Sequence, residues 1–529
     1  MPNRPKRRLR STSGAALLTA LAGILAVLAL VSPAAAAAPK SSCEARTNNT
    51  YEKLLGCVTL EGVLEHEEAF QAIVDANDDP FYPGTRAAGT EGYAESVEYV
   101  AGLLEEAGYN VTLDEFQFQF QFPFILRQLT PSVADYPANP ATGTGFGDVT
   151  AAVVPVDLNL TAPRTPSTSG CEASDFAGFP VGAIALIQRG TCPFATKVLN
   201  AVAAGAAAVI LFNQGDPGPN AGPGDRFGPV NPTLGTVTVN IPVVGTSFEA
   251  GEALARPGST ARVRVLQSET RTDVNVIAEL PGDNPDNVVM AGAHLDSVTE
   301  GPGINDNGSG SAALLETALM MAKLNPENTL RFAWWGAEEE GLVGSNAYVA
   351  ELSQGERDRI ALYLNYDMVG SPNYIFMVYD ADESTFDAPV TIPPGSTAIE
   401  DVFESYYTLI GEPYDDAEFS ARSDYQAFIL AGIPAGGLFT GAEVRKTAEQ
   451  QAIWGGTAGE QFDPCYHIAC DDINNLDLHA LEVNSDLIAF AQLTFAYSTE
   501  TVNGVPGKRV PGQPLSLPTP AGPEGTFTP

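Results

Sequence analysis

Apolar residues change their spacing along the chain, and these changes mark out its structural elements. The segments LEGVLEHEEAFQAIVDAN, from Leu60, and YAESVEYVAGLLEEAG, from Tyr93, repeat apolar residues at helical spacing on either side of a turn-rich stretch. The alternation of phenylalanine and glutamine that follows, at residues 116–124, is typical of a strand. This order of helices and strand predicts that the fold begins with elements of the α/β type.

A different pattern runs from about residue 130 to 266. It is rich in proline, glycine and threonine, with short apolar runs such as GAIALIQRG and AVILFN around an alanine-rich helix. From about residue 268, strand-like runs such as NVVMAGAHL and IALYLNYDM alternate with helical segments such as SAALLETALMMAK. The predicted fold class is therefore α/β, a mixed and mainly parallel sheet flanked by helices, with an inserted β-rich α+β domain.

The two ends of the chain differ from the rest. Basic residues near the start precede an apolar stretch and a run of alanines that ends near Ala38, which predicts a secretory signal at residues 1–38. A membrane anchor is the competing interpretation, because the apolar stretch is near the lower length limit of a membrane span. Residues 501–529 are rich in proline and glycine and predict a disordered tail.

Composition and charge narrow the functional classes. With 529 residues, 44% of them hydrophobic and 17% charged, the chain is long enough for two or more globular domains. Removal of residues 1–38 takes away five basic and no acidic residues, so the net charge falls from −38 to −43. Such a surface repels phosphate backbones, so nucleic acid is not expected as a partner. Some of the carboxylates are candidates for binding Ca²⁺.

Six cysteines behind a predicted secretory signal indicate disulfide bonds. Fifteen connectivities are formally possible for six cysteines. Proximity along the chain favours three local pairs: Cys43–Cys57, Cys171–Cys192 and Cys465–Cys470. The last pair encloses Tyr466 and His467, and a short clamped loop would hold both side chains with little freedom.

Potential metal ligands follow the predicted strands of the C-terminal half. One apolar run ends at His294, a second leads into three consecutive glutamates, and a third is followed by Asp367. Because the carboxyl ends of parallel strands meet at one edge of a sheet, we expect these side chains to converge. Carboxylates and imidazoles together suit a pair of metal ions beside a general base. The candidate ligands are His294, Asp306, Glu339, Asp367 and His467.

The motifs around these residues resemble those of the secreted double-zinc aminopeptidases, the family of aminopeptidase Y and bacterial leucine-preferring aminopeptidases. The peptidase motifs stand in the family's order: AHLDS, GINDNGSG, WWGAEEEGLVGS, NYDMVGS, ARSDYQAF, IPAGGLFTGA and PCYHIACDD. The segment from GCEASDF to AAVILFN resembles the family's protease-associated (PA) domain. The resemblance implies a zinc exopeptidase fold, with peptidase parts at residues 39–130 and 267–500 and the PA domain at residues 131–266.

The resemblance also implies a role for each candidate ligand. Two Zn²⁺ per chain are expected, one held by His294 and Asp367, the other by Glu339 and His467, with Asp306 bridging both. Glu338 aligns with the general base of the family, since the GLVGS that follows sets the register of the triple glutamate.

Further roles are implied around the metals. Asp296 is expected to accept the remaining N–H of His294, and Tyr466 to donate to the oxyanion of the tetrahedral intermediate. Arg422 and Asp424 are expected near the substrate, although Tyr425 stands where relatives often carry histidine. Relatives also often carry a cis peptide bond at the position of Asp306–Asn307.

The function that the resemblance implies is hydrolysis of the N-terminal bond of peptides with a free N-terminus, by a secreted enzyme that prefers large apolar first residues such as leucine. No membrane association is expected after signal cleavage, and the oligomeric state is left open. One alternative is a carboxypeptidase of the glutamate carboxypeptidase type, but little chain follows His467. Another is a non-catalytic binding ectodomain, but such relatives lose ligands that this chain retains. A serine hydrolase is disfavoured, because no G-x-S-x-G motif is present.

Overall fold

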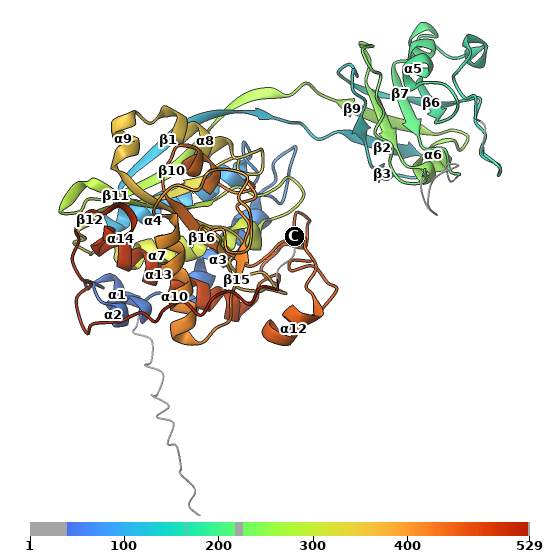
Figure 1. Ribbon diagram of the computed structural model, residues 1–529. Helices are drawn as coiled ribbons and strands as arrows, with labels where there is room; N and C mark the ends of the chain where they lie inside the picture. Colours follow the sequence, from blue (N-terminus) through green and yellow to red (C-terminus); the bar gives the residue numbers. More distant parts are fainter. Residues whose placement is uncertain (1–39, 165–166, 217–225, 527–529) are drawn as a thin grey trace, which may run out of the picture. The chain divides into compact units, whose positions relative to one another are not determined.

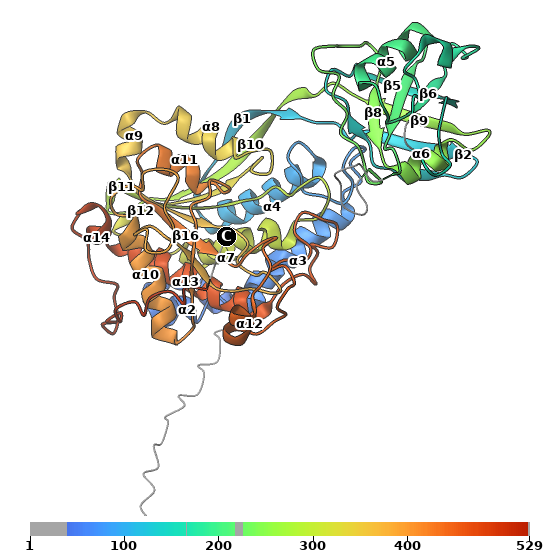
Figure 2. The same cartoon turned by 45° about the vertical axis from the view of Figure 1, so that its right-hand side comes forward.

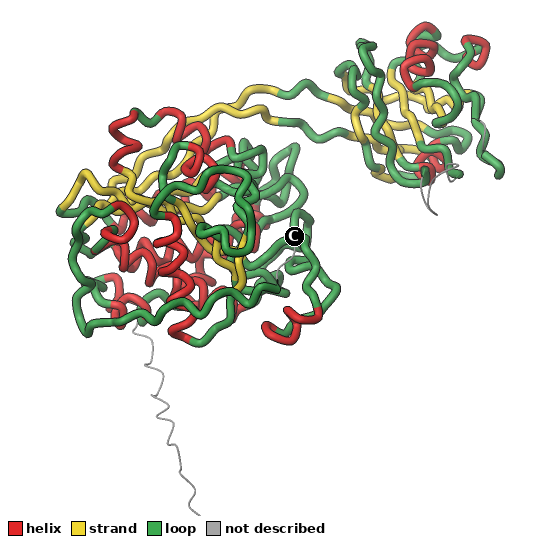
Figure 3. Tube along the Cα trace, in the orientation of Figure 1, coloured by secondary structure: helices red, strands yellow, loops and turns green. Residues whose placement is uncertain are grey.

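The computed structural model describes residues 40–164, 167–216 and 226–526. It contains two eight-stranded sheets, each with its own helices (Figures 1 and 3). The predicted signal at residues 1–38 lies outside the described residues. Within the described ranges, no helix combines the length and apolar character that a membrane crossing requires.

The first sheet has the order β1-β10-β12-β11-β13-β16-β14-β15. Its strands are β1 (Asn110–Phe120), β10 (Glu269–Leu280), β11 (Asn284–His294), β12 (Asn328–Trp335), β13 (Ile360–Tyr366), β14 (Met377–Tyr379), β15 (Asp415–Ala417) and β16 (Ala435–Phe439). The central strands β12, β11, β13 and β16 run parallel, whereas β1 and β10 pair antiparallel with their neighbours in the sheet. Strand β14 pairs antiparallel with β16 and parallel with β15. The sheet is therefore mixed, as predicted.

Helices cover both faces of this sheet. They are α1 (Lys40–Glu44), α2 (Tyr51–Leu55), α3 (Leu60–Ala76), α4 (Glu91–Ala107), α7 (Gly310–Met321), α8 (Val343–Glu351), α9 (Gln354–Arg359), α10 (Ser396–Ile410), α11 (Tyr425–Leu430), α12 (Ala448–Trp454), α13 (Leu478–Tyr497) and α14 (Glu500–Asn503). Helix α7 packs against α3, α4 and α13 below the central strands (Figure 2). It is apolar and buried almost all round, as expected of a helix enclosed by other elements.

Aromatic side chains fill the core beneath the parallel strands. Trp334 and Trp335 at the end of β12 are fully buried. The indole N–H of Trp335 donates to the hydroxyl of Tyr363 at 2.8 Å, and Tyr363 stacks on Phe428 with ring centroids 3.8 Å apart. Because these contacts fix the end of β12, they hold the residues that follow it in position.

The second sheet is built from the segment between β1 and β10. Its order is β3-β2-β9-β5-β6-β7-β8-β4. Its strands are β2 (Ile125–Thr130), β3 (Ala134–Tyr136), β4 (Asn139–Pro140), β5 (Gly147–Val156), β6 (Ile184–Gln188), β7 (Ala208–Phe212), β8 (Val243–Thr246) and β9 (Thr260–Val265), with helices α5 (Phe194–Ala203) and α6 (Phe248–Leu254). Strand β2 begins before the predicted boundary at residue 131, because the chain pairs with β9 as soon as it leaves β1.

The three local disulfides are all formed: Cys43–Cys57, Cys171–Cys192 and Cys465–Cys470. Within the tail predicted at residues 501–529, the described residues 522–526 form hydrogen bonds with the folded part of the chain. The backbone N–H groups of Gly525 and Thr526 donate to the carboxylate of Asp415, and that of Gly522 donates to the hydroxyl of Tyr414. Proline and glycine exclude helix and strand here, but the backbone donors still find fixed acceptors.

Candidate metal centre and active site

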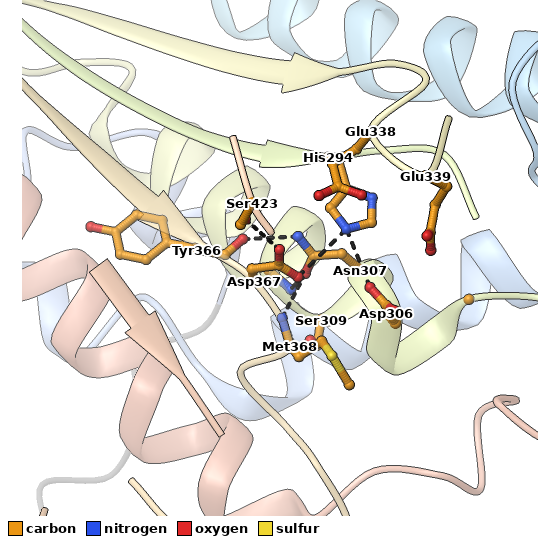
Figure 4. A network of polar contacts seen from close by, with 12 residues as sticks. His294, Asp306, Asn307, Ser309, Glu338, Glu339, Tyr366, Asp367, Met368 and Ser423 are labelled. Atoms are coloured by element: carbon orange, nitrogen blue, oxygen red, sulfur yellow. Dashed lines mark hydrogen bonds and ion pairs between the residues drawn. The ribbon is translucent and has the colours of Figure 1, made fainter. Parts of the chain in front are cut away.

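The five candidate ligands meet at the carboxyl edge of the parallel strands. Figure 4 shows four of them, His294, Asp306, Glu339 and Asp367. His294 ends β11, Glu339 follows β12 and Asp367 follows β13. Asp306 lies in the segment Ile304–Ser309 that leads into α7, at a point where the backbone is not helical. His467 lies in the loop closed by the last disulfide. The predicted convergence is therefore present.

The ligand atoms form two groups that share Asp306. In the first, His294 Nε2 lies 3.2 Å from Asp306 Oδ1 and 3.5 Å from Asp367 Oδ1. In the second, His467 Nε2 lies 3.1 Å from Asp306 Oδ2 and 3.1 Å from Glu339 Oε2. Asp306 thus offers one oxygen to each group, in the division that the sequence predicted.

The protonation of His294 shows that its group fits a cation. Its Nδ1 lies 3.0 Å from the main-chain carbonyl oxygen of Asp296, which can only accept, so Nδ1 carries the hydrogen. Burial lowers the pKa of His294, but the carboxylates of Glu338 and Asp367 outweigh burial and raise that pKa well above the usual range. A positive charge is therefore favoured at Nε2, as a proton or as a metal ion between the ring and the two carboxylate oxygens. Tetrahedral zinc with bonds of about 2.0–2.1 Å would place ligand atoms roughly 3.3 Å apart, close to the distances found.

The electrostatics of the second group lead to the same conclusion. Burial raises the pKa of Glu339 to about 8, and the carboxylate of Asp306 adds to the shift. Burial lowers the pKa of His467, but its contacts with these two carboxylates outweigh burial and raise that pKa to about 10. Glu339 Oε1 is also buried without a hydrogen-bond partner among the described residues. A divalent cation would offset this surplus of negative charge.

Glu338 stands beside the metal groups without belonging to either. It lines the cavity, and only 8% of its surface is exposed. Burial raises its pKa well above the usual range; the neighbouring His294 opposes the shift and the carboxylate of Glu339 adds to it. A carboxylate with a raised pKa next to a metal centre can take up and return a proton.

The role expected of Asp296 is corrected by the structure. Its carboxylate lies 3.8 Å from His294 Nδ1, too far for a hydrogen bond, and the main-chain carbonyl takes that place. The carboxylate instead accepts the backbone N–H groups of Glu338, at 3.0 Å, and Glu339, at 3.3 Å. Asp296, which follows β11, therefore orients the turn after β12 by binding the two backbone N–H groups of that turn.

The cavity in front of the metal groups has a volume of about 300 Å³. Tyr466 lines it, with its ring stacked on His467 at 3.7 Å and its hydroxyl accepting an N–H of Arg422 at 3.0 Å. Burial raises the pKa of the Tyr466 hydroxyl, so the group stays protonated and able to donate. Arg422 also pairs with Glu443 at 2.8 Å.

Asp424, which was expected near the substrate, lies behind the cavity wall. Its side chain is 1% exposed and does not line the cavity. It begins α11, and the turn before it points Arg422 and Ser423 into the cavity instead. Ser423 donates a hydrogen bond to Asp367 (Figure 4). Tyr425, where relatives often carry histidine, accepts the N–H of Ala421 at 2.9 Å.

Comparison with known proteins identifies the family. The sequence profile of peptidase family M28 matches residues 275–492, and that of the PA domain matches residues 149–254. An aminopeptidase of Pseudomonas aeruginosa is 48% identical over 458 residues, which cover 84% of this chain and 83% of that protein. The chain belongs to peptidase family M28.

Other M28 relatives agree with this assignment. A probable leucine aminopeptidase 2 of Aspergillus fumigatus is 41% identical over 449 residues, 84% of each chain. The structure of BSAP, a zinc aminopeptidase from Bacillus subtilis, matches with a TM-score of 0.51 and 27% identity over 82% of this chain and 94% of that one. The protein is thus a metallo-aminopeptidase with a PA domain inserted in the M28 fold, as its motifs predicted.

Asp471 and Asn307 support the M28 centre through contacts that the sequence analysis did not predict. The carboxylate of Asp471 accepts the backbone N–H groups of Asn305, at 2.9 Å, and Asp306, at 3.1 Å. The amide oxygen of Asn307 accepts the N–H of Met368 at 3.1 Å and so ties this segment to the end of β13. The Asp306–Asn307 bond is cis, as expected. Nothing in the sequence pairs these distant positions.

Proposed function

We propose that this M28 aminopeptidase holds two zinc ions, one in each group of ligands. The shared carboxylate of Asp306 carries the proposal, because its two oxygens lie 3.2 and 3.1 Å from the two histidine nitrogens. Three carboxylates and two neutral imidazoles balance most of the charge of two Zn²⁺ and leave positions for water and substrate. Zinc bound there would polarise the scissile carbonyl and lower the pKa of a water molecule.

Glu338 is the proposed general base. Its position beside both groups, on a turn fixed by Asp296, places its carboxylate at the cavity wall. It would take the proton of the attacking water and pass it to the departing amine, which becomes a neutral leaving group. Burial raises the pKa of Glu338 and so makes its carboxylate a stronger base for the water proton.

Tyr466 and Arg422 are proposed to act on the substrate carbonyl. The tyrosine hydroxyl accepts from Arg422, which leaves its own hydrogen free for the developing oxyanion. The arginine in turn is held by Glu443, so the hydroxyl is oriented before substrate binds.

The proposed substrates are peptides with a free N-terminus and a large apolar first residue such as leucine. Carboxylates in the cavity attract an ammonium group, and Arg422 is its one cationic arginine or lysine side chain among the described lining residues. Apolar and aromatic side chains form another part of the wall and suit an aliphatic side chain. They are Met377, Tyr379, Phe439, Val444 and Phe462.

Secretion is the proposed location. The three disulfides require an oxidising environment, and residues 1–38 have the pattern of a secretory signal.

Hydrolysis of leucine p-nitroanilide and of its N-acetylated form, before and after chelation, tests the proposal. We expect cleavage of the free amine alone, loss of activity on chelation and recovery with Zn²⁺. Equal cleavage of the acetylated form would contradict the proposed substrate class. A zinc-loaded protein inactive on both would point to the carboxypeptidase or the non-catalytic alternative.

A further inference from the structure

A second cluster of buried carboxylates, made of residues other than the five candidate zinc ligands, joins α10 to β15. Both elements are labelled in Figure 1. One oxygen each of Glu400, Glu404 and Asp416 lies within 4.8 Å of the others. Their exposed fractions are only 3%, 8% and 0%. Three carboxylates this close repel one another strongly in a buried setting, so their arrangement calls for a compensating charge.

The protein itself supplies no such charge. No lysine or arginine of the described ranges forms an ion pair with any of the three. Asp416 Oδ2 accepts the hydroxyls of Ser384 and Thr385, but Asp416 Oδ1 is buried and has no hydrogen-bond partner among the described residues. A fully buried carboxylate oxygen without a donor indicates that something else contacts it.

The adjoining loop is organised around the same cluster. Asp380 accepts the backbone N–H groups of residues 384, 385 and 386 at 2.7–2.9 Å, which curls the loop over Asp416. Glu400 Oε2 accepts the N–H groups of Ala381, at 3.2 Å, and Asp382, at 3.0 Å. Glu400 also forms a second close group with Asp380 and Asp382. These bonds use the backbone N–H groups of the loop on Asp380 and on Glu400 Oε2. They provide no donor for Asp416 Oδ1.

We propose that this cluster binds a calcium ion through Glu400, Glu404 and Asp416. The donors are all oxygens, and neither histidine nor cysteine belongs to the group, which favours a hard cation over zinc. Ca²⁺ accepts several carboxylates in irregular geometry, whereas Mg²⁺ demands a near-octahedral shell and keeps most of its water. Three crowded carboxylates, two on helix α10 and one on strand β15, suit the larger ion.

The position of the site suggests what the ion does. Strands β14 and β15 pair with each other, and the N–H of Asp380 donates to the carbonyl of Ala417 at 3.0 Å. Met377 and Tyr379 of β14 and Ala417 of β15 line the substrate cavity. An ion that joins α10 to β15 therefore braces one wall of that cavity. It is a structural site, separate from the proposed zinc centre.

Equilibrium dialysis of the zinc-loaded protein against radioactive calcium tests the proposal directly. We expect one Ca²⁺ per chain in the wild type and none in Asp416→Asn or Glu404→Gln. Asp401→Asn is the matched control, because it removes an exposed negative charge from the same helix without removing a proposed ligand; it should bind calcium normally. No calcium bound by the wild type, or unchanged binding by Asp416→Asn, would overturn the site.

Thermal unfolding separates lost binding from misfolding. Calcium at about 100 times its Kd should raise the Tm of the wild type by roughly 4 °C and leave that of Asp416→Asn unchanged. Without calcium, Asp416→Asn should unfold at or above the wild-type Tm, since the amide relieves the repulsion. A variant less stable than calcium-free wild type would contradict that repulsion, and an equal shift with Mg²⁺ would contradict the choice of calcium.

Discussion

The metal centre and the cluster at α10 and β15 both bury several carboxylates, yet they differ in what accompanies those carboxylates. At the first, His294 and His467 contribute nitrogen, and the groups open onto a cavity with Glu338 in its wall. At the second, every donor is an oxygen, and the 380–386 loop covers the group. The donor type selects the ion, and access to a cavity separates a catalytic centre from a structural one.

A third carboxylate shows that burial alone does not indicate an ion. Asp273 is mostly buried, but it accepts the backbone N–H groups of Gly89, at 2.7 Å, and Val274, at 3.0 Å. Its negative charge is therefore met by the protein's own donors. Buried carboxylate oxygens that lack hydrogen-bond donors, and not burial alone, therefore distinguish the proposed ion sites. Four further measurements bear on the roles of these carboxylates and their neighbours.

The largest effect is expected from Glu338→Gln. The glutamine cannot take a proton from water, so kcat should fall by about 100- to 10,000-fold. Because Glu338 belongs to neither ligand group, the zinc content and the Tm should stay at wild-type values. Steady-state kinetics with metal analysis of the same samples gives the answer. Loss of zinc along with activity would mean that Glu338 is a ligand.

The next effect is expected from Tyr466→Phe. Removal of the hydroxyl takes away the proposed oxyanion donor, and kcat should fall by about 100-fold with little change in KM. Tyr425→Phe is the matched control, since Tyr425 also lines the cavity but its hydroxyl accepts from the backbone of Ala421. If both variants lose the same activity, the Tyr466 hydroxyl has no special role.

A smaller effect is expected from Asp296→Asn. The amide can accept only one of the two N–H groups of Glu338 and Glu339, so the turn should loosen and zinc affinity should fall by about 10- to 100-fold. Asp273→Asn serves as control, because it changes a carboxylate with the same kind of backbone partners outside the metal centre. Competition with a zinc indicator measures the zinc affinity of both variants. Equal affinities in the two variants would refute the role of Asp296.

The smallest effect concerns pH and Asp273. Burial raises its pKa to about 6, although the hydrogen bonds from Gly89 and Val274 oppose the shift. The pKa of Asp273 is higher in the folded than in the unfolded protein, so protonation of Asp273 favours folding. Its contribution to the free energy of unfolding is complete below about pH 4 and is lost as the pH rises through about 6. The loss is at most about 3 kcal/mol.

Asp273→Asn removes that dependence. Urea unfolding should show the variant more stable than the wild type near pH 8, with the difference vanishing near about pH 4. A constant difference across this range would show that Asp273 does not titrate there.

Prediction from the sequence succeeded where a residue's place follows from its own strand. His294, Glu339 and Asp367 each follow an apolar run, and parallel strands bring such positions together. It failed where a side chain's partner belongs to another loop. Asp296 was expected to meet an imidazole but meets two backbone donors, and Asp424 was expected at the substrate but is buried.

The sequence by itself determined the α/β class, the inserted PA domain, the disulfide pairs and the set of residues that converge. Periodicity and strand order suffice for the fold class and for the convergence, since parallel strands deliver their carboxyl ends to one edge. The PA domain followed from the resemblance of its motifs to the family, and the disulfide pairs followed from proximity along the chain. Only the tertiary structure decided which carboxylates find donors and which do not. Asp273 and Asp416 look alike in the sequence, but backbone N–H groups reach both oxygens of Asp273 and leave one oxygen of Asp416 unpartnered among the described residues. That difference depends on how distant loops pass each other, which no local pattern encodes.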